Sequence, residues 1–66
     1  MAHTPDTTEL QAWLTEAEAY ALAELCKRIG FRDCRENAVS DDEAYLMLRA
    51  TDKVRHALQQ RGVVVR

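Results

Sequence analysis

Two cysteines and a histidine are the residues of this sequence best suited to metal binding. Cys26, Cys34 and His56 are scattered along the chain and lack the CxxC or similar spacing that is typical of zinc sites. Cys26 is also in helical register with Leu22 and Ile29, which favours its interpretation as a small buried hydrophobic residue. We therefore predict no metal site and no bound cofactor.

The acidic residues best placed for general acid–base chemistry form one run, Asp41, Asp42 and Glu43. This run stands where a helix is expected to begin, and carboxylates there stabilise the helix through its dipole. His56 has no partner that the sequence pattern identifies. The chain lacks a nucleophile elbow, a glycine-rich phosphate loop and an HExxH motif, and 66 residues leave little room for a deep pocket. We expect that the protein is not an enzyme.

Basic side chains gather in the second half of the chain. This candidate basic face consists of Arg49, Lys53, Arg55 and Arg61. It could bind nucleic acid or an acidic protein surface, or it could be an ordinary solvated face. Residues 1–26 carry acids but no lysine or arginine, so the two halves could dock on each other within the chain or between copies. The same charge distribution is also explained by the helix dipole, which favours acidic residues at helix starts and basic residues at helix ends.

The order strand, helix, helix is also that of ribbon-helix-helix repressors. In those proteins a two-stranded ribbon reads DNA, and N–H groups at the start of the second helix hold phosphates. Here Asp6 and Glu9 lie on or beside the candidate ribbon, and the second helix opens with three acids. These carboxylates would repel phosphate. Nucleic-acid binding is therefore disfavoured, and a small transcriptional regulator that uses the basic face is kept as the alternative function.

The elements that position these residues are predicted by a repeated helix-start signal. Thr15 is followed three positions later by Glu18, and Ser40 is followed in the same way by Glu43. Each pair is the signature of a capping box, and apolar residues at helical spacing follow each one. We predict helices over 16–29 and 41–60.

Stop signals define the segments that follow each helix. Lys27, Arg28 and Gly30 are typical of a helix C-terminus, with Phe31 placed to fold back on the first helix. Residues 31–39 are expected to be a link with a short helical turn. Gly62 ends the second helix, and residues 63–66 are expected to be an extended tail.

The N-terminal segment has two interpretations. Alternation of apolar and polar residues at 8–14 fits a short strand, which we prefer because a capping Thr15 requires extended backbone. Such a strand could pair with the C-terminal tail. Leu10, Trp13 and Leu14 also fit a helix. Residues 1–7 are polar and are expected to be disordered.

The second helix is apolar on more than one side, which is typical of a helix that meets a partner. A chain of 66 residues also has a marginal core unless it is stapled or associates. We therefore expect a homodimer that also binds an unknown protein. The candidate interface consists of Trp13, Tyr20, Tyr45, Leu46 and Leu48.

The expected location is the cytoplasm. No stretch is long and apolar enough for a membrane span, and residues 1–14 do not have the pattern of a signal peptide. Two cysteines are too few for a disulfide framework and suit a reducing compartment.

Four short motifs resemble a family of short, functionally uncharacterised proteins from proteobacteria and their phages. They are EAYALA at 18–23, KRIGFRD at 27–33, DEAY at 42–45 and VRHAL at 54–58. The resemblance covers roughly residues 14–61. It implies a bacterial or prophage origin and an accessory role, and it transfers no functional residues because the family has no established activity.

These observations predict a mainly α protein with a single small domain over 1–66. The expected architecture is a two-helix hairpin with a short N-terminal extended segment and a short extended C-terminal tail. The expected function is that of a small non-enzymatic protein-interaction module.

Overall fold

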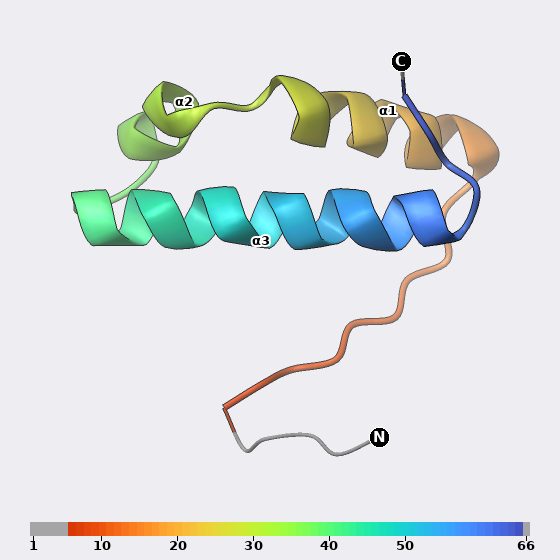
Figure 1. Ribbon diagram of the computed structural model, residues 1–66, viewed down its shortest axis with the longest axis horizontal. Coiled ribbons are helices and arrows are strands. Elements are labelled where there is room, and N and C mark those ends of the chain that lie inside the picture. Colours follow the sequence, from red (N-terminus) through yellow and green to blue (C-terminus); the bar gives the residue numbers. More distant parts are fainter. Residues whose placement is uncertain (1–5, 66) are drawn as a thin grey trace.

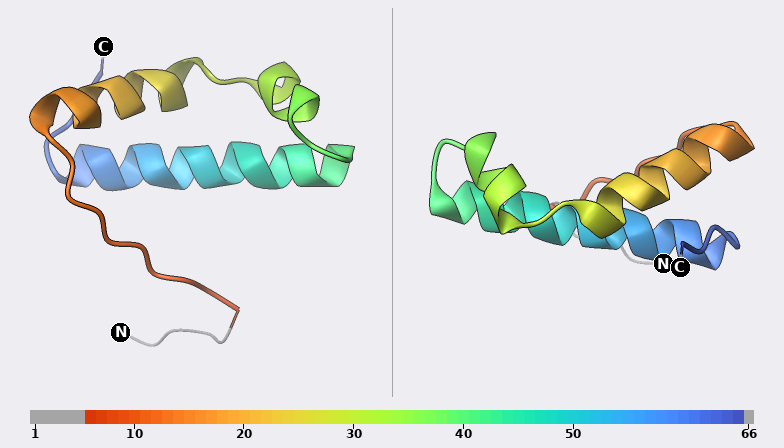
Figure 2. Two further views of the ribbon diagram at one scale, coloured as in Figure 1. Left: turned by 180° about the vertical axis from the view of Figure 1, so that it is seen from behind. Right: turned by 90° about the horizontal axis from the view of Figure 1, so that it is seen from above.

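The computed structural model describes residues 6–65, and three helices form in this part of the chain. They are α1 (Glu16–Arg28), α2 (Phe31–Glu36) and α3 (Asp41–Gln60). Figure 1 shows α1 and α2 one after the other along one side of α3. Seen from above, α1 crosses α3 obliquely (Figure 2). The mainly helical class is confirmed, but the arrangement has three helices in place of the expected two-helix hairpin.

Helix α1 begins with a complete capping box. The N–H of Glu18 donates to the Thr15 hydroxyl oxygen at 3.1 Å, and the N–H of Thr15 donates to the Glu18 carboxylate at 2.8 Å. Two N–H groups that would otherwise have no partner in the helix are satisfied in this way. The predicted start is therefore confirmed.

The end of α1 differs from the prediction. Ile29 is extended, with φ −68° and ψ 130°, so the helix stops at Arg28 and not at Ile29. Gly30 is also extended, with φ −120°, and is not the left-handed cap that usually favours glycine. Its N–H donates to the Asp33 carboxylate at 2.9 Å. Gly30 is thus the N-cap of α2, and in place of the expected fold-back on α1 Phe31 contacts Tyr45 of α3.

Helix α2 lies inside the segment that was expected to be a link. It ends where the Asn37 side-chain amide donates to the Asp33 carbonyl at 2.9 Å. Arg35 then ties the following turn to the start of α3. Its Nε donates to Asp41 Oδ1 at 2.6 Å, and its Nη1 donates to the Ala38 carbonyl at 3.0 Å. These bonds fix the position of α2 relative to α3.

Helix α3 has the predicted bounds but a modified cap. The Ser40 hydroxyl oxygen accepts from the Glu43 N–H at 3.2 Å, as predicted. The Glu43 carboxylate, however, accepts from the N–H of Val39 at 3.0 Å rather than from that of Ser40. The cap therefore reaches one residue further back than a capping box does.

The C-terminal end of α3 is closed by a Schellman motif. Gly62 has a φ of +85°, in the left-handed region that favours glycine. Its N–H donates to the Gln59 carbonyl at 3.0 Å, and that of Val63 donates to the Leu58 carbonyl at 2.9 Å. Two terminal carbonyls are thereby satisfied, and the chain turns back toward α1.

The core between the helices is made of small side chains. The buried apolar residues are Ala19, Ala23 and Cys26 on α1, Cys34 on α2 and Ala44 on α3. Small side chains let helix backbones approach closely, but they bury little apolar area, and each buried Å² contributes only about 25 cal/mol. Among the described residues, Cys34 is the largest side chain that is fully buried. The core is correspondingly thin.

The N-terminal segment is neither the expected strand nor the alternative helix. Residues 7–15 have no regular secondary structure, and no strand forms within residues 6–65. A strand needs a neighbour to pair with, and the tail at 63–65 does not provide one because the two segments leave the helices in different directions (Figures 1 and 2). The expectations for residues 1–5 and for Arg66 lie outside the described residues.

Candidate interaction surface on helix α3 and the N-terminal arm

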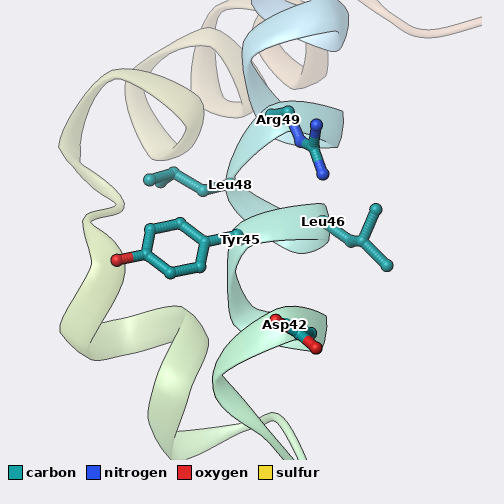
Figure 3. A pocket seen from close by; sticks show the side chains of 5 residues that line it. All are labelled: Asp42, Tyr45, Leu46, Leu48 and Arg49. Atoms are coloured by element: carbon teal, nitrogen blue, oxygen red, sulfur yellow. The ribbon is translucent and has the colours of Figure 1, made fainter.

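An open hollow of about 540 Å³ lies on the flank of α3. It is lined by Asp42, Tyr45, Leu46, Leu48 and Arg49 (Figure 3). Residues three, four and seven positions apart share one side of a helix, which brings most of this set together. Tyr45 and Leu48 point to one side of α3, and Leu46 points to the other (Figure 3). We call this feature the α3 hollow.

The Phe31 ring holds the Tyr45 ring in place at the edge of the α3 hollow. The two ring centroids are 4.7 Å apart and the planes are tilted by 36°. Aromatic pairs at this separation attract each other beyond the area that they bury. Tyr45 nevertheless stays about half exposed. The hollow therefore has a wall that is fixed by α2 and still accessible to a partner.

A second apolar feature is the N-terminal arm, which we define as residues 6–14. Every residue of the arm is exposed, and Trp13 is as accessible as it would be in an isolated peptide. Leu10 and Leu14 are also exposed. Large apolar side chains that are this accessible and this close together are typical of an interaction site.

The structure brings together only part of the predicted interface. Tyr45, Leu46 and Leu48 line the same hollow. Trp13 lies on the arm, and Tyr20 lies in the second turn of α1, at the opposite end of α3 from Tyr45. Sequence reasoning did not select Phe31, Asp42 or Leu10. The sequence feature that could have identified Leu10 is its spacing of three and four residues from Trp13 and Leu14. The contact of Phe31 depends on the packing of α2, so no comparable sequence feature identifies it.

The predicted basic face is divided. Arg49 and Lys53 are exposed on α3, whereas Arg55 is half-buried on a different side. Six positions along an α-helix correspond to a rotation of about 120°, so Arg49 and Arg55 cannot share one face. Arg61 follows the last residue of α3 as its cap. These four residues therefore do not form a single surface.

The two cysteines are buried and unpaired. This agrees with the interpretation of Cys26 as a core residue, whereas Cys34, which lies outside the regular helical pattern of the sequence, was expected to be partly exposed and is buried by the packing of α2. Burial raises the pKa of the Cys26 thiol, and the positive charge of Arg55 partly opposes this effect. Cys26 therefore stays protonated at neutral pH. Within residues 6–65 no group of three or more ligand-type side chains is arranged to hold a metal ion. In the same part of the chain, no helix has the length and apolar character needed to cross a membrane.

Comparison with known proteins places the chain in a family. The model of a family of unknown function, DUF7706, matches residues 1–66. The chain belongs to DUF7706. Searches of the curated proteins and of the solved structures found no match. Membership in DUF7706 confirms the resemblance to an uncharacterised family.

Proposed function

We propose that this DUF7706 protein is a small interaction module that acts by binding another protein and not by catalysis. The observation that carries the proposal is the exposure of large apolar side chains at two places. Trp13 and Leu10 are exposed on the arm, and Tyr45 and Leu46 are exposed at the α3 hollow. A few central side chains, tryptophan and tyrosine prominent among them, supply most of the binding energy in protein interfaces.

The form of the α3 hollow supports binding of a side chain rather than of a small substrate. Its five lining residues all come from one helix, so it is open to solvent. Sites for small molecules enclose most of the ligand surface. An open hollow with apolar walls and one charge of each sign at its edge, Asp42 and Arg49, suits an apolar side chain flanked by polar groups.

A matched pair of variants tests the proposal. Leu46 and Leu25 are exposed to the same degree, 58% and 57%, but Leu46 lines the α3 hollow and Leu25 lies on α1. The tagged full chain is used to capture proteins from the source cell, alongside Leu46→Gln and Leu25→Gln. Glutamine preserves helix propensity. A protein that is retained by the wild type and by Leu25→Gln and lost with Leu46→Gln supports the proposal. Identical capture by all three chains and by Trp13→Ala overturns it.

The alternative, a nucleic-acid-binding regulator, is supported less well. It rests on Arg49 and Lys53 at the accessible side of α3, with Arg61 beyond its end. Asp42 lines the same hollow as Arg49 and would repel phosphate. Binding that weakens steeply with salt, and whose salt dependence is reduced by Arg49→Gln, would favour this alternative over the interaction module.

We further propose that the protein works in the cytoplasm of a bacterium, or of a bacterium that carries a prophage, as an accessory factor. The buried unpaired cysteines are compatible with a reducing compartment. The sequence motifs that resemble short proteobacterial and phage proteins support the origin. We also propose that the protein self-associates.

A further inference from the structure

We propose that the α3 hollow of one copy receives the N-terminal arm of a second copy, so that two chains exchange arms in a symmetric dimer. Trp13 of each copy would enter the hollow of the other, between Tyr45 and Leu46. The inference rests on the proposed interaction function and specifies its first partner. Four observations carry it.

The first observation is the reach of the arm. The arm leaves α1 at Thr15, beside the C-terminal end of α3 (Figures 1 and 2). The α3 hollow lies in the first turns of α3. From Leu58 to Leu46 the helix spans about 18 Å, at about 1.5 Å per residue. Trp13 is two residues from Thr15, so the Cα atoms of the two residues can lie at most about 7 Å apart. Trp13 therefore cannot enter the hollow of its own chain.

The second observation is that a two-fold axis between two copies brings the arm of each copy close to the hollow of the other. In an antiparallel pair of α3 helices, the C-terminal end of one helix lies beside the start of the other. The arm of one copy then begins next to the hollow of its partner. A two-fold axis makes the reverse contact identical, so both hollows are filled at once.

The third observation is chemical complementarity. Leu10, Trp13 and Leu14 are the large apolar side chains of the arm, and all three are exposed. The walls of the hollow are apolar, and Arg49 and then Lys53 extend the surface along α3. The arm also carries Asp6 and Glu9 and no basic residue. Apolar groups thus meet apolar groups, and acidic residues meet basic ones.

The fourth observation is the large accessible surface of the chain. It exposes 5948 Å², whereas a compact monomer of 7.5 kDa is expected to expose about 4,200 Å². The excess is about 1,700 Å², and a stable interface of standard size buries about 800 Å² on each partner. The excess is therefore larger than the area that one partner contributes to an interface of standard size.

The fluorescence of Trp13 tests the inference directly, because it is the only tryptophan of the chain. The full chain is diluted from millimolar to submicromolar concentration while emission, iodide quenching and sedimentation are recorded. We expect the emission to shift to shorter wavelength and the quenching to fall as the dimer forms. A monomer at every concentration overturns the inference, and so does a dimer in which Trp13 stays as accessible to iodide as in the denatured chain.

Complementation between two variants separates arm exchange from other modes of dimerisation. Trp13→Ala removes the arm's main side chain and keeps the hollow, and Leu46→Gln alters the hollow and keeps the arm. Each variant alone should dimerise at least about 30-fold more weakly, as expected for a central interface residue. A mixture should form heterodimers in which one intact arm meets one intact hollow. In this mixture only the Leu46→Gln chain carries tryptophan, so its emission should shift on mixing.

The controls keep the result interpretable. Leu25→Gln should dimerise like the wild type, and far-UV circular dichroism should show the same helix content in all variants. Dimerisation of the wild type without any recovery in the mixture would show that the dimer uses another surface. Capture of a different protein through Leu46 by a chain that stays monomeric would overturn arm exchange and leave the proposed interaction function in place.

Discussion

The aromatic ring of Phe31 lies 4.7 Å from that of Tyr45, and this contact joins the first residue of α2 to the second turn of α3. The contact does two things for the fold. It replaces the expected return of Phe31 to α1, and it fixes one wall of the α3 hollow. The stability of α2 and the shape of the candidate site therefore depend on the same pair of rings.

Replacing Phe31 by alanine should remove this support. We expect a loss of about 2 to 3 kcal/mol in the free energy of unfolding, somewhat below the usual cost for a fully buried phenylalanine because Phe31 is half-buried. Urea unfolding followed by circular dichroism measures the loss. Tyr20→Ala serves as the control, since Tyr20 is exposed on α1, and it should cost less than about 1 kcal/mol. Equal losses for the two variants would contradict a structural role of the ring pair.

The capping box of α1 should make stability depend on pH through Glu18. The hydrogen bonds from the Thr15 N–H and hydroxyl lower the pKa of the Glu18 carboxyl below its ordinary value of 4.5. Because the pKa in the folded state is lower than in the unfolded state, the stabilising effect is present above pH 4.5 and is lost as pH falls through the folded-state pKa.

Glu18→Gln removes this titration and tests the dependence. Unfolding by urea at several pH values between neutral and acidic should show a smaller loss of stability for the variant than for the wild type. Thr15→Ala should cost about 1 kcal/mol at neutral pH, as usual for a helix cap. A wild type and a Glu18→Gln variant with identical pH profiles would contradict the assignment.

Arg35 should contribute more than the other exposed arginine of α2. Arg35 bonds both Asp41 and the Ala38 carbonyl, whereas Arg32 faces Glu36 at 3.7 Å and is 93% exposed. We expect Arg35→Gln to cost about 1 kcal/mol and Arg32→Gln to cost close to nothing, as is usual for an exposed ion pair. Thermal and urea unfolding of the two variants measure the difference. A loss in the free energy of unfolding that is as large for Arg32→Gln as for Arg35→Gln would contradict the Arg35 bonds described here.

The cysteines should be protected from alkylation in the folded protein. Both thiols are buried, and burial raises the pKa of Cys26, so the reactive thiolate is scarce. Iodoacetamide at pH 8 should label them slowly without denaturant and rapidly in urea. A cysteine introduced at the exposed position Ala21 of α1 should react at the unfolded rate in both conditions. Fast labelling of Cys26 in the folded chain would contradict the described core.

The starts of the two long helices were predictable from the sequence because caps are local. The bonds between Thr15 and Glu18 span three residues, and so does the bond between Ser40 and the Glu43 N–H. The same is true of the glycine that ends α3, since a left-handed residue is required there. Local hydrogen bonds and backbone preferences are written in neighbouring residues, and they need no knowledge of the rest of the fold.

Gly30 shows where such reasoning stops. A glycine after two basic residues predicts a left-handed cap, yet Gly30 is extended and starts α2. The packing of α2 on α3 determines this outcome, because it brings Phe31 to Tyr45 and ties Arg35 to Asp41. The acidic carboxylate of Asp33 then satisfies the Gly30 N–H. The contacts with Tyr45 and Asp41 do not follow from the order of residues around Gly30 alone.

The candidate site divides in the same way. The sequence by itself determined that Tyr45, Leu46 and Leu48 stand on one helix and that Leu10, Trp13 and Leu14 have helical spacing. Only the tertiary structure decided that the first set lines a hollow, that the second set is exposed, and that the two lie near opposite ends of α3. Helix periodicity depends on short-range bonds, whereas exposure and separation depend on which faces pack together across the whole chain.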